Sequence, residues 1–183
     1  MPKIADIEPT PNPNARRFVL KEPLTHGAVR SYENSTQAAS DPLAAELFAI
    51  AHVTNVYYVD KYLTVTQDGL VPWNELERQV AVPIRAAQAQ EVASPTPKAD
   101  VAENLSPEDV ERLATINAIL DEQVRPALMM DGGGLEIVGL EGNKLKIHYQ
   151  GACGTCPSAI FGTLAGIEGL LRGVEPDIEL VAV

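Results

Sequence analysis

Cysteine, positive charge and long hydrophobic runs are all scarce in this chain. Only two of its 183 residues are cysteines, and 14 Lys and Arg stand against 25 Asp and Glu, which gives a net charge of −11. A charge of this sign argues against sequence-independent binding to nucleic acid or to anionic membranes. With 45% hydrophobic and 21% charged residues, the composition is that of an ordinary globular protein.

No apolar stretch is long enough to span a membrane. Even the run from Ala159 to Val174 is interrupted by Glu168 and Arg172. The first residues have neither the apolar core of a secretory signal nor the Arg- and Ser-rich character of a transit peptide. We therefore predict a cytoplasmic protein with neither a membrane nor a nucleic acid as partner.

A composition change near the middle predicts two domains. Residues 90–104 contain two prolines, no aromatic residue and only scattered valines, too little apolar surface to offset the entropy of ordering. This segment is predicted to be a flexible linker between a domain at 1–89 and a domain at 105–183. The predicted fold class is α+β, with two small α/β domains.

The first domain alternates between strand and helix patterns. Ser40-Asp41-Pro42 offers a cap and a proline for a helix in which Leu43, Leu47 and Ile50 share one face. β-Branched and aromatic residues separated by Asp60-Lys61 predict a hairpin. The other segments predicted here are a strand at 17–20 and a helix at 73–80, and the hairpin strands are 53–59 and 62–66.

The second domain is predicted to have the order α-β-β-α-β. Ser106-Pro107-Glu108-Asp109 has the residues of a capping box, and it precedes a helical stripe of apolar residues. Pro126 is expected to kink or end that helix. Two strands, a helix opened by Pro157 and a last strand follow. The stripe consists of Val110, Leu113, Ile116, Leu120 and Val124; the strands are 135–138, 144–149 and 178–183; and the later helix buries Ile160, Leu164, Ile167 and Leu171.

The two cysteines, Cys153 and Cys156, form one C-x-x-C motif between the second strand and the following helix. Two thiolates are half of what a tetrahedral zinc ion or a cubane iron–sulfur cluster requires. Pro157 at the first helical position would place Cys156 at the N-cap, where backbone N–H groups and the helix dipole favour thiolates. Gly151 and Gly154 allow close approach of the backbone or serve as turn residues.

Three chemical uses of this pair remain open on the residues alone: a redox couple, a zinc site and an iron–sulfur site. Thioredoxin-type pairs usually enclose a proline, whereas Gly154-Thr155 separates these cysteines, which weakens the redox interpretation. A zinc site within one chain needs two more ligands. The nearby histidine, His148, is predicted by strand alternation to be an exposed residue on the face opposite Ile147 and Tyr149.

At this point the sequence resembles a known family. Asp131-Gly132-Gly133, the strand–turn–strand and Gln150-Gly151-Ala152-Cys153-Gly154-Thr155-Cys156-Pro157-Ser158 are similar to the C-terminal domain of NifU, the Nfu-type iron–sulfur scaffold. The segment from Thr10 to Leu20 resembles the start of the Nfu N-terminal domain. Gly134 departs from the pattern, because the family usually has an acidic residue there.

The resemblance implies a carrier, not an enzyme, that holds a [4Fe-4S] cluster between two subunits and passes it to apo-proteins from an exposed loop. The ligands it implies are Cys153 and Cys156 of each chain in a homodimer, with [2Fe-2S] as an alternative cluster. It also implies an upstream cluster donor, and an N-terminal domain that recognises clients or donors.

Overall fold

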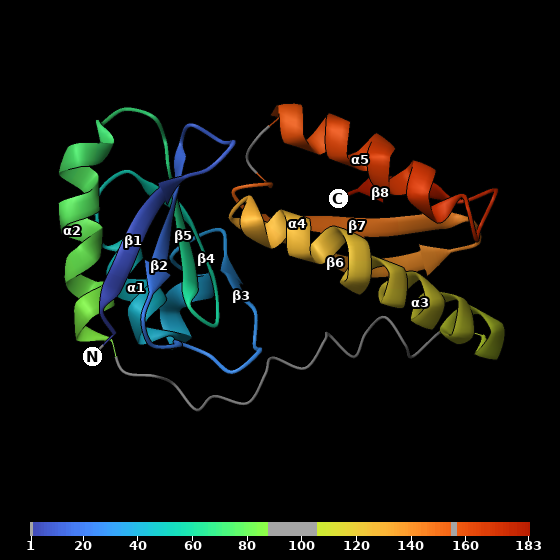
Figure 1. Ribbon diagram of the computed structural model, residues 1–183, viewed down its shortest axis with the longest axis horizontal. Coiled ribbons are helices and arrows are strands. Elements are labelled where there is room, and N and C mark those ends of the chain that lie inside the picture. The colour runs from blue at the N-terminus through green and yellow to red at the C-terminus, as the bar shows by residue number, and fades with distance from the viewer. Residues whose placement is uncertain (1, 88–105, 155–156) are drawn as a thin grey trace. The chain divides into compact units, whose positions relative to one another are not determined.

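The computed structural model describes residues 2–87, 106–154 and 157–183 (Figure 1). They form two compact units, one before residue 88 and one after residue 105. Both units combine helices with a sheet, which confirms the α+β class. The predicted linker at 90–104 lies outside the described residues.

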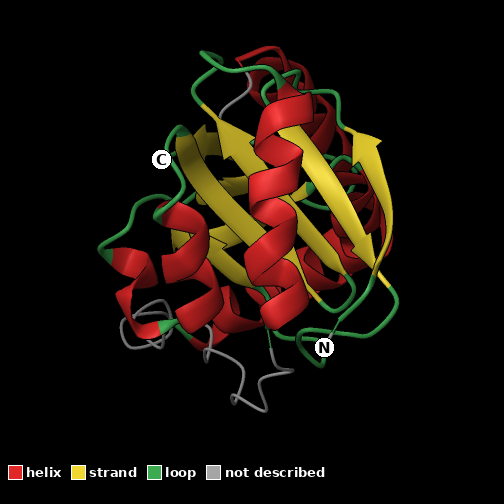
Figure 2. Ribbon diagram, turned by 90° about the vertical axis from the view of Figure 1, so that its left-hand side faces the viewer, coloured by secondary structure: helices red, strands yellow, loops and turns green. Residues whose placement is uncertain are grey.

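The first unit is built on a five-stranded antiparallel sheet in the order β1-β2-β5-β4-β3. Figure 2 shows α2 lying across this sheet. The strands are β1 (Ile4–Pro9), β2 (Ala15–Leu20), β3 (Arg30–Tyr32), β4 (Val53–Val59) and β5 (Tyr62–Gln67). The helices are the short η1 (Gln37–Ser40), α1 (Pro42–Phe48) and α2 (Trp73–Ala86).

The predicted hairpin is present as β4 and β5. Its turn residue Asp60 has φ 49°, in the left-handed region that aspartate tolerates better than most residues. Helix α2 is longer than predicted, because Val80 and Ile84 are both fully buried and hold the helix together through Pro83. Strands β1 and β3 were not predicted: β1 lies at the sheet edge with mostly half-buried or exposed residues and shows no clear apolar alternation.

Asp41 caps α1 from inside the core. Its side chain accepts a hydrogen bond from Ala44 N at 3.1 Å, and both Tyr32 and Tyr58 donate their hydroxyls to it. Burial, helped by the Asp41 carboxylate, raises the pKa of Tyr32 to about 12 and raises that of Tyr58 further. The cap predicted at Ser40-Asp41 is therefore Asp41, and it also ties β3 and β4 to the helix.

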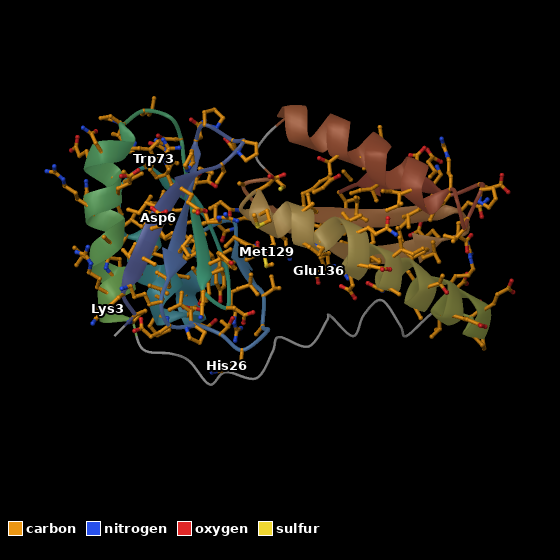
Figure 3. All side chains as sticks on the ribbon, viewed as in Figure 1. Lys3, Asp6, His26, Trp73, Met129 and Glu136 are labelled. Atoms are coloured by element: carbon orange, nitrogen blue, oxygen red, sulfur yellow. The ribbon has the colours of Figure 1, made fainter. Side chains whose placement is uncertain are left out.

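The start of α2 is fixed to the loop between β1 and β2. Trp73, labelled in Figure 3, donates its indole N–H to Pro13 O at 3.0 Å, and the Arg16 guanidinium lies 5.2 Å from the centre of its ring. Within the loop, Asn12 Oδ1 accepts from Asn14 N at 3.0 Å. The polar Thr10–Asn14 segment thus has a defined conformation.

The second unit contains a three-stranded sheet in the order β6-β7-β8. Strands β6 and β7 are antiparallel, and β8 runs parallel to β7. The predicted order α-β-β-α-β is confirmed. The elements are α3 (Pro107–Ile119), the π-helical turn η3 (Leu120–Val124), α4 (Arg125–Met130), β6 (Gly133–Glu141), β7 (Lys144–Gly151), α5 (Pro157–Leu171) and β8 (Glu179–Ala182).

Pro126 does not end the first helix of this unit. The helical path continues to Met130, and the π-helical turn η3 directly precedes the α4 segment that contains Pro126. A π-helical turn shifts the backbone hydrogen bonds from i−4 to i−5, which accommodates a residue without an N–H. The proline is visible in the sequence, but the π-helical turn that accommodates it is not.

A single hydrophobic core joins the helices to one face of the sheet. Leu145, Ile147 and Tyr149 point into it together, as predicted from their alternation. Val110 does not belong to this core, since half of it is exposed near the start of α3. On α5, Ile167 and Leu171 are buried and Leu164 packs against the core, while Ile160 lies outside the residues whose side chains are described.

The glycines of α5 predict a soft helix, that is, one with low local stability and fast amide exchange. A Cβ placed on Gly166 or Gly169 would meet nothing within 4 Å, so close packing of the described residues does not require glycine there. Gly166→Ala should raise the free energy of unfolding by roughly 0.5–1 kcal/mol, because alanine loses less backbone entropy in a helix. Thermal unfolding and amide exchange across α5 measure this effect.

Gly142→Ala is the matched control for that substitution. Its Cβ would also meet open space, but Gly142 has φ 60°, which alanine adopts only with strain. The control should therefore lower stability. Slow amide exchange across α5 in the cluster-free monomer would contradict the prediction of a soft helix.

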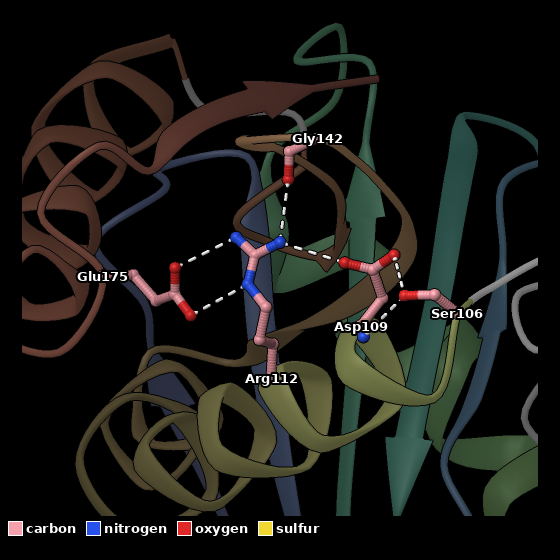
Figure 4. A network of polar contacts seen from close by, with 5 residues as sticks. All are labelled: Ser106, Asp109, Arg112, Gly142 and Glu175. Carbon is pink, nitrogen blue, oxygen red and sulfur yellow. Dashed lines mark hydrogen bonds and ion pairs between the residues drawn. The ribbon is translucent and has the colours of Figure 1, made fainter.

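Arg112 connects three parts of the second unit (Figure 4). Its guanidinium donates to both carboxylate oxygens of Glu175 at 3.0 Å, to Asp109 at 3.0 Å and to Gly142 O at 3.2 Å. Ser106 caps α3 by accepting from Asp109 N at 3.1 Å, which confirms the predicted N-cap. The network joins the start of α3 to the β6–β7 turn and to the segment before β8.

This network predicts a pH-dependent effect of Arg112→Ala. The Ser106 hydroxyl and Arg112 lower the pKa of Asp109, and Arg112 lowers that of Glu175. Carboxyl groups with lowered pKa values stabilise the fold above their ordinary pKa values and lose that contribution as the pH falls through the lowered ones. The variant should therefore be less stable near pH 7, and its difference from wild type should shrink below about pH 4.

Chemical denaturation at pH 7 and pH 3 measures that difference. Arg172→Ala serves as the control, because Arg172 pairs with Glu168 one helical turn away while its side chain is 55% exposed. An exposed pair of this kind contributes little to stability. A difference for Arg112→Ala that is unchanged at pH 3 would show that the network acts through packing rather than charge.

Candidate functional site

The cysteine loop joins the end of β7 to the start of α5, as predicted. Gly151, at the start of the loop, has φ 63°, and Gly132, in the neighbouring turn before β6, has φ 84°, so both turns pass through glycines in the left-handed region. The turn is closed by Ala152 N, which donates to Gly132 O at 3.2 Å, and by Gly154 N, which donates to Gly151 O at 3.2 Å. These bonds fix the backbone on either side of Cys153.

Cys153 is buried rather than exposed. Its exposed fraction is 5%, and it belongs to the same hydrophobic core as Ile147 and Tyr149. The expectation of an exposed loop is therefore wrong for this cysteine, because the turn directs its side chain to the core-facing side of the sheet. Cys156 lies outside the described residues. Helix α5 does begin at Pro157, as the sequence predicted.

Gly133 leaves the space that the Cys153 side chain occupies. A Cβ on Gly133 would lie 2.8 Å from Cys153 Sγ, 3.0 Å from Cys153 N and 2.4 Å from Gln150 O. Real Cβ atoms do not approach other atoms so closely, and two of these neighbours are backbone atoms that cannot simply move away. Only glycine therefore fits at position 133 without a shift of the neighbouring backbone. The position of Gly133 next to Cys153 follows from its pairing with Gly151 across β6 and β7.

Gly154 makes a second close approach. A Cβ there would lie 2.8 Å from Tyr149 O, so any side chain would push the loop away from the end of β7. The sequence left open whether this glycine serves the turn or a close approach. The contact with Tyr149 O shows that it serves a close approach within the chain.

Tyr149 lies beside Cys153 in the core and was predicted only as an apolar strand residue. Its exposed fraction is 5%, and its hydroxyl has no hydrogen-bond partner among the described residues. Burial raises the pKa of Tyr149 to about 12, and the charge of a Cys153 thiolate adds to the shift. An unpaired hydroxyl depends on how the core packs, so no sequence pattern indicates it.

The polar residues of β7 lie on the other face of the sheet. His148 is partly buried rather than exposed, and its Nδ1 lies 2.9 Å from Val183 O, within hydrogen-bond distance. Gln150 Nε2 donates to Glu136 Oε2 at 3.1 Å on the same face, where Figure 3 labels Glu136. Strand alternation places these side chains away from Cys153.

The described residues of one chain do not complete a metal site. No group of three or more His, Cys, Asp or Glu side chains in the described ranges could hold a metal ion. A zinc site of Cys153 and His148 within one chain is disfavoured, since the two side chains lie on opposite faces of the sheet. In the same ranges, no helix is long and apolar enough to cross a membrane.

Comparison with known proteins gives two family matches. Residues 4–91 match the family described as "Scaffold protein Nfu/NifU N terminal", and residues 116–182 match the "NifU-like domain". A human protein named "NFU1 iron-sulfur cluster scaffold homolog, mitochondrial" is 31% identical over 171 residues, 93% of this chain and 67% of that protein. "NifU-like protein 5, mitochondrial" from Arabidopsis thaliana is 31% identical, with coverage of 93% and 66%.

A further curated relative and a solved structure are matched with lower identity. A Drosophila erecta homologue of the human protein is 29% identical, and the chain spans 62% of it. Among solved structures, a NifU-like protein from Saccharomyces cerevisiae is 25% identical with a TM-score of 0.40, covering 44% of this chain and 74% of that one. A TM-score this low adds nothing to the sequence matches.

The comparisons correct the predicted location. The human and Arabidopsis relatives are both named mitochondrial, which contradicts the prediction of a cytoplasmic protein. That prediction relied on composition and on the character of the first residues, and neither determines a compartment.

Proposed function

Because the chain belongs to the Nfu family of iron–sulfur cluster scaffold proteins, we propose that it carries a [4Fe-4S] cluster between two copies of itself. Cys153 and Cys156 of each copy would be the ligands, and the cluster would pass to apo-proteins. The observation that carries the proposal is the packing of Cys153 against Gly133, in the segment that matches the NifU-like domain.

The number of ligands supports a shared cluster. A [4Fe-4S] cluster is usually held by four cysteine thiolates, and each chain has two cysteines in all. The described residues of one chain provide no further group of metal ligands near Cys153. Two chains together supply four thiolates, which is the reason for proposing a homodimer. The same count would suit a [2Fe-2S] cluster.

The residues around Cys153 fit such a cargo. Gly133 and Gly154 have no side chain, so the backbone of β6 lies close to Cys153 and the cysteine loop lies close to the end of β7. Helix α5 begins at Pro157, where unpaired N–H groups and the helix dipole favour negative charge on nearby sulfurs. These features offset the cost of bringing thiolates together in an acidic protein.

Transfer would proceed by exchange of thiolates without redox chemistry. A client thiolate replaces Cys153 or Cys156 on iron, the released cysteine takes up a proton, and repetition hands the cluster over. Nothing in this exchange requires a catalytic residue, so we propose a carrier and not an enzyme. The partners would be apo iron–sulfur proteins and an upstream cluster donor.

Anaerobic reconstitution with iron and sulfide tests the proposal. Brown protein with absorbance in the visible range and four irons per two chains is the expected result. Colourless protein with one zinc per two chains would instead favour a shared Cys₄ zinc site. A monomer without metal that forms a reversible Cys153–Cys156 disulfide would favour thiol–disulfide exchange.

We further propose that the domain at 1–89 recognises clients or donors and that the linker at 90–104 lets it move relative to the domain at 105–183. The first domain has no cysteine and so cannot be a second cluster site. Deleting residues 1–93 should leave cluster assembly intact, because the second unit has its own core, and should slow delivery to particular clients. Unchanged delivery would refute this role.

A further inference from the structure

The Tyr149 hydroxyl is a polar group that the fold buries without a hydrogen bond. It has no partner among the described residues, although only 5% of the residue is exposed. An unsatisfied buried hydroxyl destabilises a fold, so each one calls for a physical reason. Tyr58 in the first unit shows the usual arrangement, since its buried hydroxyl donates to Asp41.

The strand register places Tyr149 beside the cysteine loop. Leu135 pairs with Tyr149 across β6 and β7, and Gly133 pairs with Gly151 two residues further on. Alternate residues of a strand share a face, so the Tyr149 side chain lies on the same side of the sheet as the space above Gly133. Cys153 Sγ occupies that space.

Two further observations connect Tyr149 to the loop. The backbone of Gly154 packs against Tyr149 O, and Tyr149 and Cys153 belong to one continuous hydrophobic core. The Tyr149 side chain is therefore buried in the core on the same face of the sheet as Cys153 Sγ. Water is largely excluded there, and a hydrogen bond to a charged atom is correspondingly strong.

We propose that Tyr149 is a positioning residue whose hydroxyl donates a hydrogen bond to the Cys153 sulfur once that sulfur binds a cluster. The inference rests on the proposed function. A neutral thiol is a weak acceptor, whereas a ligating thiolate carries negative charge and accepts strongly. The hydroxyl has no partner among the described residues, and the charged sulfur of a ligating Cys153 would supply one. Hydrogen bonds to ligating sulfurs are a recognised means of tuning iron–sulfur sites.

Tyr149→Phe in the full-length protein tests this inference with two readouts that move in opposite directions. The cluster-free variant should be as stable as wild type or more stable, because the substitution removes an unsatisfied hydroxyl. The reconstituted variant should lose its cluster to an iron chelator roughly tenfold faster, the change expected when a hydrogen bond to a charged group is lost. Resonance Raman bands of the iron–thiolate bonds should shift as well.

Tyr58→Phe is the matched control. It removes a hydroxyl that is paired, so it should lower the stability of the first unit and leave cluster loss and Raman bands unchanged. The inference is overturned if Tyr149→Phe destabilises the cluster-free protein and retains its cluster as well as wild type does. A failure of wild type to take up any cluster would instead refute the proposed function itself, and that result is seen before any variant is compared.

Discussion

Cys153→Ala is expected to abolish stable cluster binding while leaving the second unit folded. Replacing one of two ligands per chain leaves a dimer with two thiolates, too few to hold a cubane cluster. The cost to the cluster-free fold should be small, about 1 kcal/mol, because alanine removes only the sulfur from a site that is 5% exposed. Visible absorbance after reconstitution and thermal unfolding of the cluster-free protein measure the two effects separately.

Cys156→Ala should give the same loss of cluster. If either single variant retains one cluster per two chains, the ligand set of Cys153 and Cys156 is wrong. If Cys153→Ala instead prevents folding, its main role is in the core, and the loss of cluster would say nothing about ligation. The stability measurement on the cluster-free variant separates these two outcomes.

Gly133→Ala is expected to have the second large effect. The added methyl group would lie 2.4 Å from Gln150 O and 2.8 Å from Cys153 Sγ, so β7 or the cysteine loop must shift. Overpacking of this kind costs roughly 1–3 kcal/mol. We also expect weaker cluster retention, because the side chain displaced is that of the proposed ligand.

Gly139→Ala provides the control on the same strand. A Cβ at Gly139 would meet nothing within 4 Å, so this variant should keep both its stability and its cluster. Equal effects of the two substitutions would indicate that β6 needs glycine for its backbone and not for the contact with Cys153. Chelator challenge and urea unfolding of both variants decide this.

Local sequence signals predicted much of the fold correctly. The hairpin of β4 and β5 and the start of α3 at Ser106-Pro107 depend on turn residues, caps and alternation that act over a few residues. Long-range packing explains the failures. Edge strand β1 has no clear apolar face, and the helix continues past Pro126 because the π-helical turn before it removes the steric conflict.

The candidate site was predictable in its residues and not in its geometry. The C-x-x-C motif and its position between a strand and a helix can be read from the sequence. The contact between Gly133 and Cys153 depends on the register of β6 and β7, and the unpaired Tyr149 hydroxyl depends on how the core packs around it. Gly134 stands where the family usually has an acidic residue. It is buried, and it pairs with Gln150 across β6 and β7.

Native mass spectrometry of the anaerobically reconstituted protein, combined with Mössbauer spectroscopy, tests the central claim most directly. The account predicts a species of two chains and one [4Fe-4S] cluster, which dissociates to monomers when the iron is removed by a chelator. A complete cluster on a single chain, or a stable dimer that carries no cluster and takes up none, would contradict it.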